Sequence, residues 1–284
     1  MTSSNLSIIT NESIWPPILT ESLKKRIKTA VIIGIPILFM VFYNDLSRII
    51  FLGLLVALTA IEFLDLHYGT FTKRPLIYVL TLGLAGAVFA GTYLKLVPPE
   101  LMLLAAVATC VLTIDLYQRF IVKDKKAAWF YTFMYATLPL VSLLTIYDQP
   151  YFGKLLIGCL LLVWVSDIAA YFVGKSIGKR KLMPSISPGK TREGFLGAGM
   201  ITILSSYIMY NFLGYFSFQQ WALIALLVWL LGSIGDLVES KLKRQLNIKD
   251  SGNILPGHGG FLDRFDGFIF CLPAVSIVAF YIFQ

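Results

Sequence analysis

The chain has 284 residues, of which 57% are hydrophobic and only 14% are charged. A soluble globular protein of this length needs more polar surface than that, so the composition excludes this class. The net charge of +8 could indicate a nucleic-acid partner, but the positions of the cations, given below, argue against nucleic acid.

The sequence contains nine apolar runs. Each is long enough, or nearly long enough, to form a helix that crosses a hydrocarbon core about 30 Å thick. Their hydrophobic residues are continuous rather than alternating, which favours helices over the strands of a membrane barrel. We therefore predict an all-α, polytopic integral membrane protein with about nine transmembrane helices. The predicted spans are 29–43, 49–64, 76–94, 101–118, 128–147, 154–173, 195–213, 219–235 and 267–283.

The cations are divided unequally between the two sides of this predicted membrane. Lysine and arginine are concentrated on the amino-terminal flank and in the even-numbered loops, whereas the other loops hold only Arg48, Lys95 and Lys154. Cytoplasmic loops are enriched in these residues, so the pattern predicts a cytoplasmic amino terminus. The charge therefore indicates membrane topology first and attraction to anionic lipid headgroups second.

This topology divides the chain into three parts. Residues 1–23 form a polar amino-terminal extension, residues 24–150 hold transmembrane helices 1–5, and residues 151–284 hold helices 6–9. The longest polar connections are the predicted cytoplasmic loops 174–193 and 236–266, whereas the outward loops are short and carry few charges. We expect the chemistry in these two cytoplasmic loops.

Three carboxylates bracket the loop 236–266. Asp236 lies where the eighth helix is expected to continue into the cytoplasm, and Asp263 and Asp266 share a face at the start of the ninth helix. Carboxylate oxygens suit Mg²⁺, and metal ions held in this way support in-line displacement at phosphorus. The alternative is that these are solvated helix ends, since the helix dipole favours acids near an amino terminus.

The same loop contains groups that suit phosphate. Ser240 and Lys243 share a helix face with Asp236, and a glycine-rich turn could present backbone N–H groups to phosphate oxygens. Taken singly, each cation is also explained by topology and the turn by an ordinary loop. The candidates in this loop are Ser240, Lys243, Arg244, Lys249, His258, Gly259, Gly260 and Arg264.

The loop 174–193 contains Ser-Pro-Gly-Lys-Thr at positions 187–191. The upstream glycine and the preceding strand of a P-loop are missing, so that motif is rejected. What remains is a rigid turn that offers Ser187, Lys190 and Thr191 to an anion, with Glu193 opening the seventh helix. A plain basic loop is the alternative.

Ionisable residues also occur inside the predicted spans. Asp167 lies within the sixth span, where a charge is costly and points to a cavity or a relay. Glu62 and Asp115 lie closer to the ends of their spans, and we interpret them as interfacial.

The segment from Ser240 to Asp266 resembles the signature of phosphatidate cytidylyltransferases, also called CDP-diacylglycerol synthases. It reads Ser-x-Leu-Lys-Arg-x4-Lys-Asp-x-Gly-x2-Leu-Pro-x-His-Gly-Gly-Phe-x-Asp-Arg-Phe-Asp. The stretches 187–194 and 164–171 are also similar to parts of these enzymes, whereas the first 150 residues share only their hydropathy with them.

The resemblance implies an enzyme that transfers the cytidylyl group of CTP to phosphatidate, giving CDP-diacylglycerol and pyrophosphate. It also implies a homodimer in a bacterial inner membrane, with the active site on the cytoplasmic face. The implied metal ligands are Asp236, Asp263 and Asp266, which would hold Mg²⁺, with room for a second cation such as K⁺. Catalysis is assigned to these three residues and Lys249, and substrate binding to Asp167, Ser187, Lys190, Thr191, Ser240, Lys243, Arg244, His258, Gly259, Gly260 and Arg264.

Two other kinds of membrane protein share some of these features. A CDP-alcohol phosphotransferase also uses aspartates and Mg²⁺ at a membrane, but its Asp-Gly-x2-Ala-Arg pattern is absent from this sequence. A cation-coupled transporter would show repeated halves with broken helices in corresponding positions, and the sequence shows no such repeat.

Overall fold

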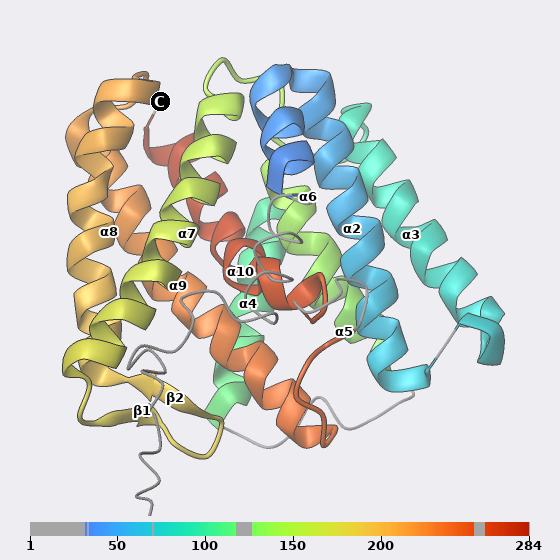
Figure 1. Cartoon of the computed structure of the whole chain (residues 1–284). Coiled ribbons are helices and arrows are strands. Elements are labelled where there is room, and N and C mark those ends of the chain that lie inside the picture. Colours follow the sequence, from blue (N-terminus) through green and yellow to red (C-terminus); the bar gives the residue numbers. More distant parts are fainter. Residues whose placement is uncertain (1–31, 33, 70, 118–126, 253–258, 284) are drawn as a thin grey trace, which may run out of the picture.

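The computed structural model describes residues 32, 34–69, 71–117, 127–252 and 259–283. The described chain is mostly helical, and its helices pack side by side in a bundle (Figure 1). Six helices are long and apolar enough to cross a membrane. They are α2 (Asp45–Tyr68), α3 (Pro75–Tyr93), α7 (Phe152–Ile177), α8 (Arg192–Leu213), α9 (Phe218–Gln245) and α10 (Leu262–Ile277) with its π-helical continuation η4 (Val278–Ile282).

Three further apolar helices are shorter. They are Gly34–Tyr43, α4 (Leu101–Tyr117) and a composite helix made of α5 (Ala128–Thr132), the π-helical η3 (Phe133–Thr137) and α6 (Leu138–Leu144). A short 3₁₀ turn, η1 (Phe71–Lys73), precedes α3. All nine predicted apolar runs therefore fall on helices in the described part of the chain, and six of these helices have the length of a span.

Side-chain caps decide where two of the long helices begin. The Asn44 side chain accepts a hydrogen bond from the Ser47 N–H (2.8 Å), and the Ser47 hydroxyl accepts one from the Asn44 N–H (3.1 Å). This reciprocal capping box starts α2 directly after Asn44. Ser217 and Gln220 form the same motif at the start of α9. From there α9 continues to Gln245, which confirms the prediction that the eighth helix extends beyond its apolar run.

The described chain is mostly helical, as predicted, but it also contains one short hairpin that the prediction did not include. The loop between α7 and α8 forms an antiparallel hairpin of β1 (Lys181–Met183) and β2 (Ser187–Thr191), in which Met183 pairs with Ser187. Both of these residues precede a proline, which disfavours helical backbone and favours extended backbone. The hairpin therefore follows from local chemistry that the apolar pattern does not report.

The outer surface of the bundle is apolar. On α8, for example, Leu204 and Phe212 are 71% and 84% exposed. Exposed apolar area of this extent is unfavourable in water and suits a hydrocarbon surrounding. The centre is occupied by α10, which packs against α9, α6 and α4 and is more enclosed than the other spans.

Two ends of the bundle can be distinguished in Figure 1. The hairpin end contains β1, β2 and the carboxyl-terminal turns of α2, α7 and α9. The pocket end contains the amino-terminal turns of α2 and α7 and the turn between α6 and α7.

Candidate functional site

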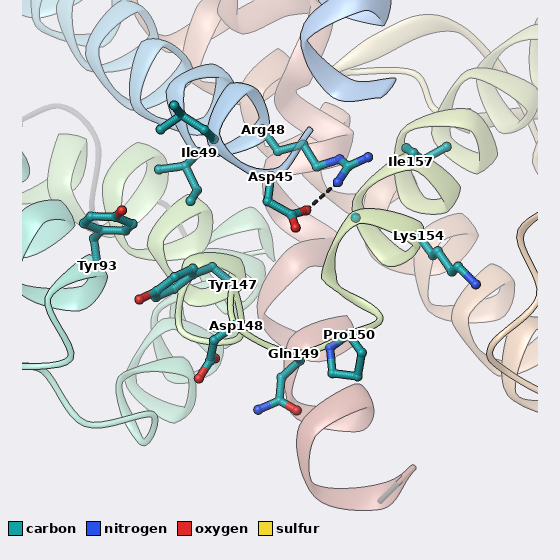
Figure 2. Close-up of a pocket in the computed structure, with 12 residues that line it drawn as sticks. Asp45, Arg48, Ile49, Tyr93, Tyr147, Asp148, Gln149, Pro150, Lys154 and Ile157 are labelled. Carbon is teal, nitrogen blue, oxygen red and sulfur yellow. Dashed lines mark hydrogen bonds and ion pairs between the residues drawn. The ribbon is translucent and has the colours of Figure 1, made fainter. Parts of the chain in front are cut away.

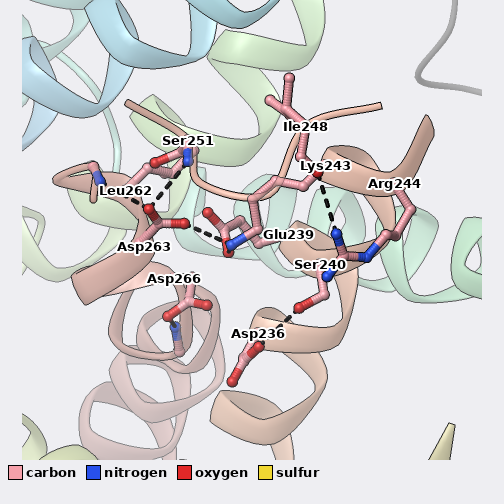
Figure 3. Close-up of polar contacts among 12 residues, drawn as sticks. Asp236, Glu239, Ser240, Lys243, Arg244, Ile248, Ser251, Leu262, Asp263 and Asp266 are labelled. Atoms are coloured by element: carbon pink, nitrogen blue, oxygen red, sulfur yellow. Dashed lines mark hydrogen bonds and ion pairs between the residues drawn. The ribbon is translucent and has the colours of Figure 1, made fainter. Parts of the chain in front are cut away.

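A close crossing of α9 and α10 brings two predicted carboxylates together. A Cβ atom on Gly235 of α9 would lie 2.5 Å from Cβ of Phe270 and 2.8 Å from the carbonyl oxygen of Asp266. Only glycine allows this approach. Asp236 follows directly on α9, so the crossing places it beside Asp266 on α10 (Figure 3).

Asp236 is paired with a cation from the hairpin. Lys190 Nζ of β2 lies 2.6 Å from Asp236 Oδ2, and the Ser240 hydroxyl donates to Asp236 Oδ1 at 3.1 Å. The side chains of Lys190 and Asp236 are 28% and 35% exposed, so a ligand can reach them. The structure therefore joins the two predicted loops at one ion pair.

Two further carboxylates face this ion pair. The charge of Asp266 interacts with those of Asp236 and Asp167, and Asp167 also interacts with Lys190 and Arg264. Asp167 on α7 therefore belongs to the same site as the aspartates of α9 and α10. Three carboxylates close together repel one another unless cations neutralise them.

Asp263 lies in an adjoining polar cluster (Figure 3). Lys243 Nζ bridges Asp263 Oδ1 at 2.5 Å and Glu239 Oε2 at 2.6 Å. Asp263 Oδ2 accepts hydrogen bonds from the backbone N–H groups of Ser251 (3.0 Å) and Gly260 (2.8 Å). Glu239 is only 1% exposed, and it was not a predicted site residue. Its position four residues before Lys243 on the predicted helix could have indicated this ion pair.

The remaining candidates of the hairpin region have different surroundings. Ser187 is half-buried in β2. The Thr191 hydroxyl is buried and accepts a hydrogen bond from the Gly194 N–H at 3.1 Å, which caps α8. The Glu193 carboxylate accepts hydrogen bonds from the N–H groups of Lys179 and Arg180, so it ties the hairpin to the start of α8.

The remaining candidates of the loop 236–266 lie around the aspartates. Arg244 donates to the carbonyls of Ile186 and Ile248, both at 3.3 Å, so it links α9 to the hairpin. Lys249 and Arg264 are exposed. Gly259 has a φ of +82°, which favours glycine, and Gly260 contacts the Asp263 carboxylate as described above. His258 lies outside the described residues.

The donor chemistry of the site fits Mg²⁺. Among the described residues, no three acidic, histidine or cysteine side chains stand close enough together to hold a metal ion by themselves. Mg²⁺, however, is usually bound by one or two carboxylates together with water and substrate phosphates. Asp236 and Asp266 meet that requirement, whereas the oxygens of Asp263 already accept three hydrogen bonds from the chain.

The interpretation of Glu62 and Asp115 as interfacial residues did not anticipate their burial. Glu62 is 1% exposed and Asp115 is 4% exposed. Asp115 on α4 pairs with Lys241 of α9, Nζ to Oδ2, at 2.9 Å. Glu62 on α2 accepts a hydrogen bond from the Leu262 N–H at 2.6 Å. Both acids therefore connect the amino-terminal helices to the helices that carry the aspartates.

A pocket of about 560 Å³ opens at the other end of the bundle (Figure 2). It is lined by the first turn of α2, the end of α3 and the turn that leads into α7, and none of the predicted site residues lines it. Of its charged residues, Arg48 pairs with Asp45 and Asp148 with Lys95, while the Lys154 ammonium lies over the Tyr215 ring.

The fold and the site define a class: a helical membrane protein in which carboxylates and cations from distant segments meet at one end of the bundle. Comparison with known proteins narrows this class. Residues 24–282 match the model of the cytidylyltransferase family, so the chain belongs to that family. This confirms the predicted resemblance and the prediction that the protein is an enzyme.

Among similar proteins are two bacterial phosphatidate cytidylyltransferases. That of Bacillus subtilis (strain 168) is 34% identical over 267 residues, which cover 88% of this chain and 95% of that protein. That of Staphylococcus aureus (strain COL) is also 34% identical, over 268 residues that cover 90% of this chain and 98% of that protein. The phosphatidate cytidylyltransferase of Staphylococcus saprophyticus is 48% identical over 120 residues, covering 42% of this chain and 46% of that protein.

Proposed function

We propose that this enzyme transfers the cytidylyl group of CTP to phosphatidate, giving CDP-diacylglycerol and pyrophosphate. The observation that carries the proposal is the meeting of Asp167, Asp236 and Asp266 with Lys190 at the hairpin end of a bundle with an apolar surface. A polar nucleotide and a lipid phosphate can both reach such a place. The full-length similarity to phosphatidate cytidylyltransferases supports this choice of substrates.

Asp236 and Asp266 are proposed to hold Mg²⁺, because their oxygens suit this ion and Asp236 is accessible. Asp263 is the third predicted ligand and would join by exchanging its contact with Lys243. These residues would hold Mg²⁺ where its positive charge could neutralise the negative charge that develops on the leaving pyrophosphate. We also propose that the same site can hold a second cation such as K⁺.

The chain's own residues are proposed to orient the two substrates and neutralise their charge. Lys190 and Lys243 already contact carboxylates of the site and can turn to phosphate oxygens when CTP enters, with Arg264 and Lys249 nearby on exposed positions. A phosphate oxygen of phosphatidate then forms a bond to the α-phosphorus of CTP as the bond to pyrophosphate breaks in line. The phosphate is already ionised, so this step requires no general base.

The proposal includes an orientation in the membrane. Nine spans, a cytoplasmic amino terminus and a cytoplasmic hairpin end are supported by the concentration of lysine and arginine in the corresponding loops. The bacterial relatives favour a bacterial inner membrane, and the family resemblance favours a homodimer.

The decisive test uses the purified protein in detergent with phosphatidate, labelled CTP and Mg²⁺. The wild type should form lipid-linked cytidylate and release pyrophosphate. Asp236→Asn should lower the rate by at least about 100-fold, because loss of several kcal/mol of transition-state stabilisation corresponds to that factor.

Asp148→Asn is the matched control, since Asp148 is an ion-paired aspartate at the pocket end; it should leave the rate unchanged. Absence of lipid-linked cytidylate from the wild type would refute the proposed reaction. Full activity in Asp236→Asn would refute only the role of the aspartate.

A further inference from the structure

Glu62 caps the helix that carries two of the site aspartates. The first residue of α10 is Leu262, and its N–H donates to Glu62 Oε2 at 2.6 Å. The local cap residue, Phe261, provides no side-chain cap. A carboxylate from α2, 200 positions away along the chain, therefore satisfies an N–H group at the positive end of the α10 dipole.

Two glycines make room for this carboxylate. A Cβ atom on Gly252 would lie 2.0 Å from Glu62 Oε1, and one on Gly260 would lie 1.9 Å from the same oxygen. A Cβ on Gly260 would lie equally close to the buried hydroxyl of Ser251, so this hydroxyl and Oε1 are neighbours. Both glycines lie in the connection between α9 and α10, and Gly260 is two residues before the start of α10.

The residues around Glu62 also hold Asp263. The backbone N–H groups of Ser251 and Gly260 both donate to Asp263 Oδ2. Glu62 and Asp263 thus both lie against Ser251 and Gly260. A displacement of the Glu62 carboxylate would change both the donors to Asp263 and the first turn of α10.

We infer that Glu62 is a positioning residue for the transfer reaction, because it caps the start of α10 and packs against Gly252 and Gly260, and so sets where Asp263 and Asp266 stand. The inference rests on the function proposed above. Glu62 contacts neither Asp236 nor Lys190 in the described structure and acts through α10. At 1% exposure, its Oε2 accepts the Leu262 N–H, whereas its Oε1 is buried without a hydrogen-bond partner among the described residues.

The test compares Glu62→Ala, Glu62→Gln and the wild type. Glu62→Ala should lower kcat by about 10- to 100-fold, the usual cost of removing a group that orients a metal ligand, and raise the Mg²⁺ concentration for half-maximal rate. The KM for phosphatidate should not change, because Glu62 is buried and cannot contact the lipid itself. Glu62→Gln keeps an acceptor oxygen for the Leu262 N–H and should recover most of kcat.

Hydrogen exchange supplies a readout without substrate or metal. In Glu62→Ala the amides of Ser251, Gly260 and Leu262 should exchange faster than in the wild type, whereas in Asp236→Asn they should not. Thr59→Val is the matched control: Thr59 is buried on the same helix and its hydroxyl donates only within α2, so both exchange and kcat should match the wild type.

If Glu62→Ala does not fold, Gly252→Ala tests the same contact by pushing a methyl group against Oε1, with Gly86→Ala, which has open space around it, as its control. Wild-type kcat and exchange in folded Glu62→Ala or Gly252→Ala would overturn the inference. A glutamine variant as poor as the alanine variant would overturn the capping role. Because Asp236→Asn is assayed in parallel, failure of this inference is distinguishable from failure of the proposed function.

Discussion

The two ends of the bundle both carry charged residues, but they use them differently. At the pocket end the charges form simple pairs: Arg48 with Asp45 three residues earlier on α2, and Lys95 with Asp148. At the hairpin end the charges come from α2, α7, β2, α9 and α10, and several are buried. The large cavity is at the pocket end, whereas carboxylates that repel one another are at the hairpin end.

This difference shows that cavity volume alone does not locate the site in this protein. Three of the four charged residues that line the pocket, Asp45, Arg48 and Asp148, already form ion pairs and have little to offer a polyphosphate. Clustered carboxylates that need cations are costly to fold and are typical of functional sites. If the two ends differ in this way, substitutions at the hairpin end should have larger effects than substitutions at the pocket end.

The buried pair Lys241–Asp115 should contribute most to stability. Lys241→Met leaves Asp115, which is 4% exposed, as a buried charge without its lysine, so the free energy of unfolding should fall by about 3–5 kcal/mol. Thermal or denaturant unfolding in detergent measures this. The double variant Lys241→Met/Asp115→Leu should regain most of the loss, and an unchanged unfolding midpoint in the single variant would contradict the prediction.

Lys190 should contribute to catalysis rather than to stability. Lys190→Met removes the cation that faces Asp236, so kcat/KM for CTP should fall by about 10- to 100-fold, as expected for a lost hydrogen bond to a charged group. Steady-state kinetics with varied CTP measures the effect. Lys181→Met is the control, because Lys181 is an exposed residue of β1 in the same hairpin, and it should behave as the wild type. Equal losses in both variants would show that the effect comes from the loss of positive charge in general.

The pocket-end pair Lys95–Asp148 should have the smallest effect. Its side chains are 44% and 49% exposed, and exposed pairs typically contribute about 0.2–1 kcal/mol. A double-mutant cycle with Lys95→Met and Asp148→Asn should give a coupling energy in that range, with unchanged activity in all variants. A larger coupling energy or a loss of activity would show that the pocket end takes part in the reaction.

Much of the fold was predictable because apolar runs of span length report helices directly. The helical extension of α9 and the shared face of Asp263 and Asp266 on α10 followed from helical periodicity. The β1–β2 hairpin was missed because proline effects on residues 183 and 187 act locally, within a segment that hydropathy reads as a loop.

The site was predictable in part for a related reason. Asp236 and Lys190 were each identified from local motifs, but their 2.6 Å contact joins two loops whose distance no motif encodes. Asp167 could be singled out by the cost of a charge inside a span, yet its interaction with the aspartates depends on how α7 packs. The role of Glu62 could not be predicted, because a single acid near a span end has no pattern that names its partner.

The amino-acid sequence alone was enough to predict the membrane class, the helices, the asymmetry of charge and the residues that suit phosphate and metal. These properties depend on hydropathy, periodicity and side-chain chemistry, which are local. Which candidates contact one another is seen only in the folded protein. Gly235 allows α9 and α10 to cross closely, Lys190 pairs with Asp236 and Glu62 caps α10. Such contacts arise from the packing of segments far apart in the chain, and packing depends on the shapes of all the helices together.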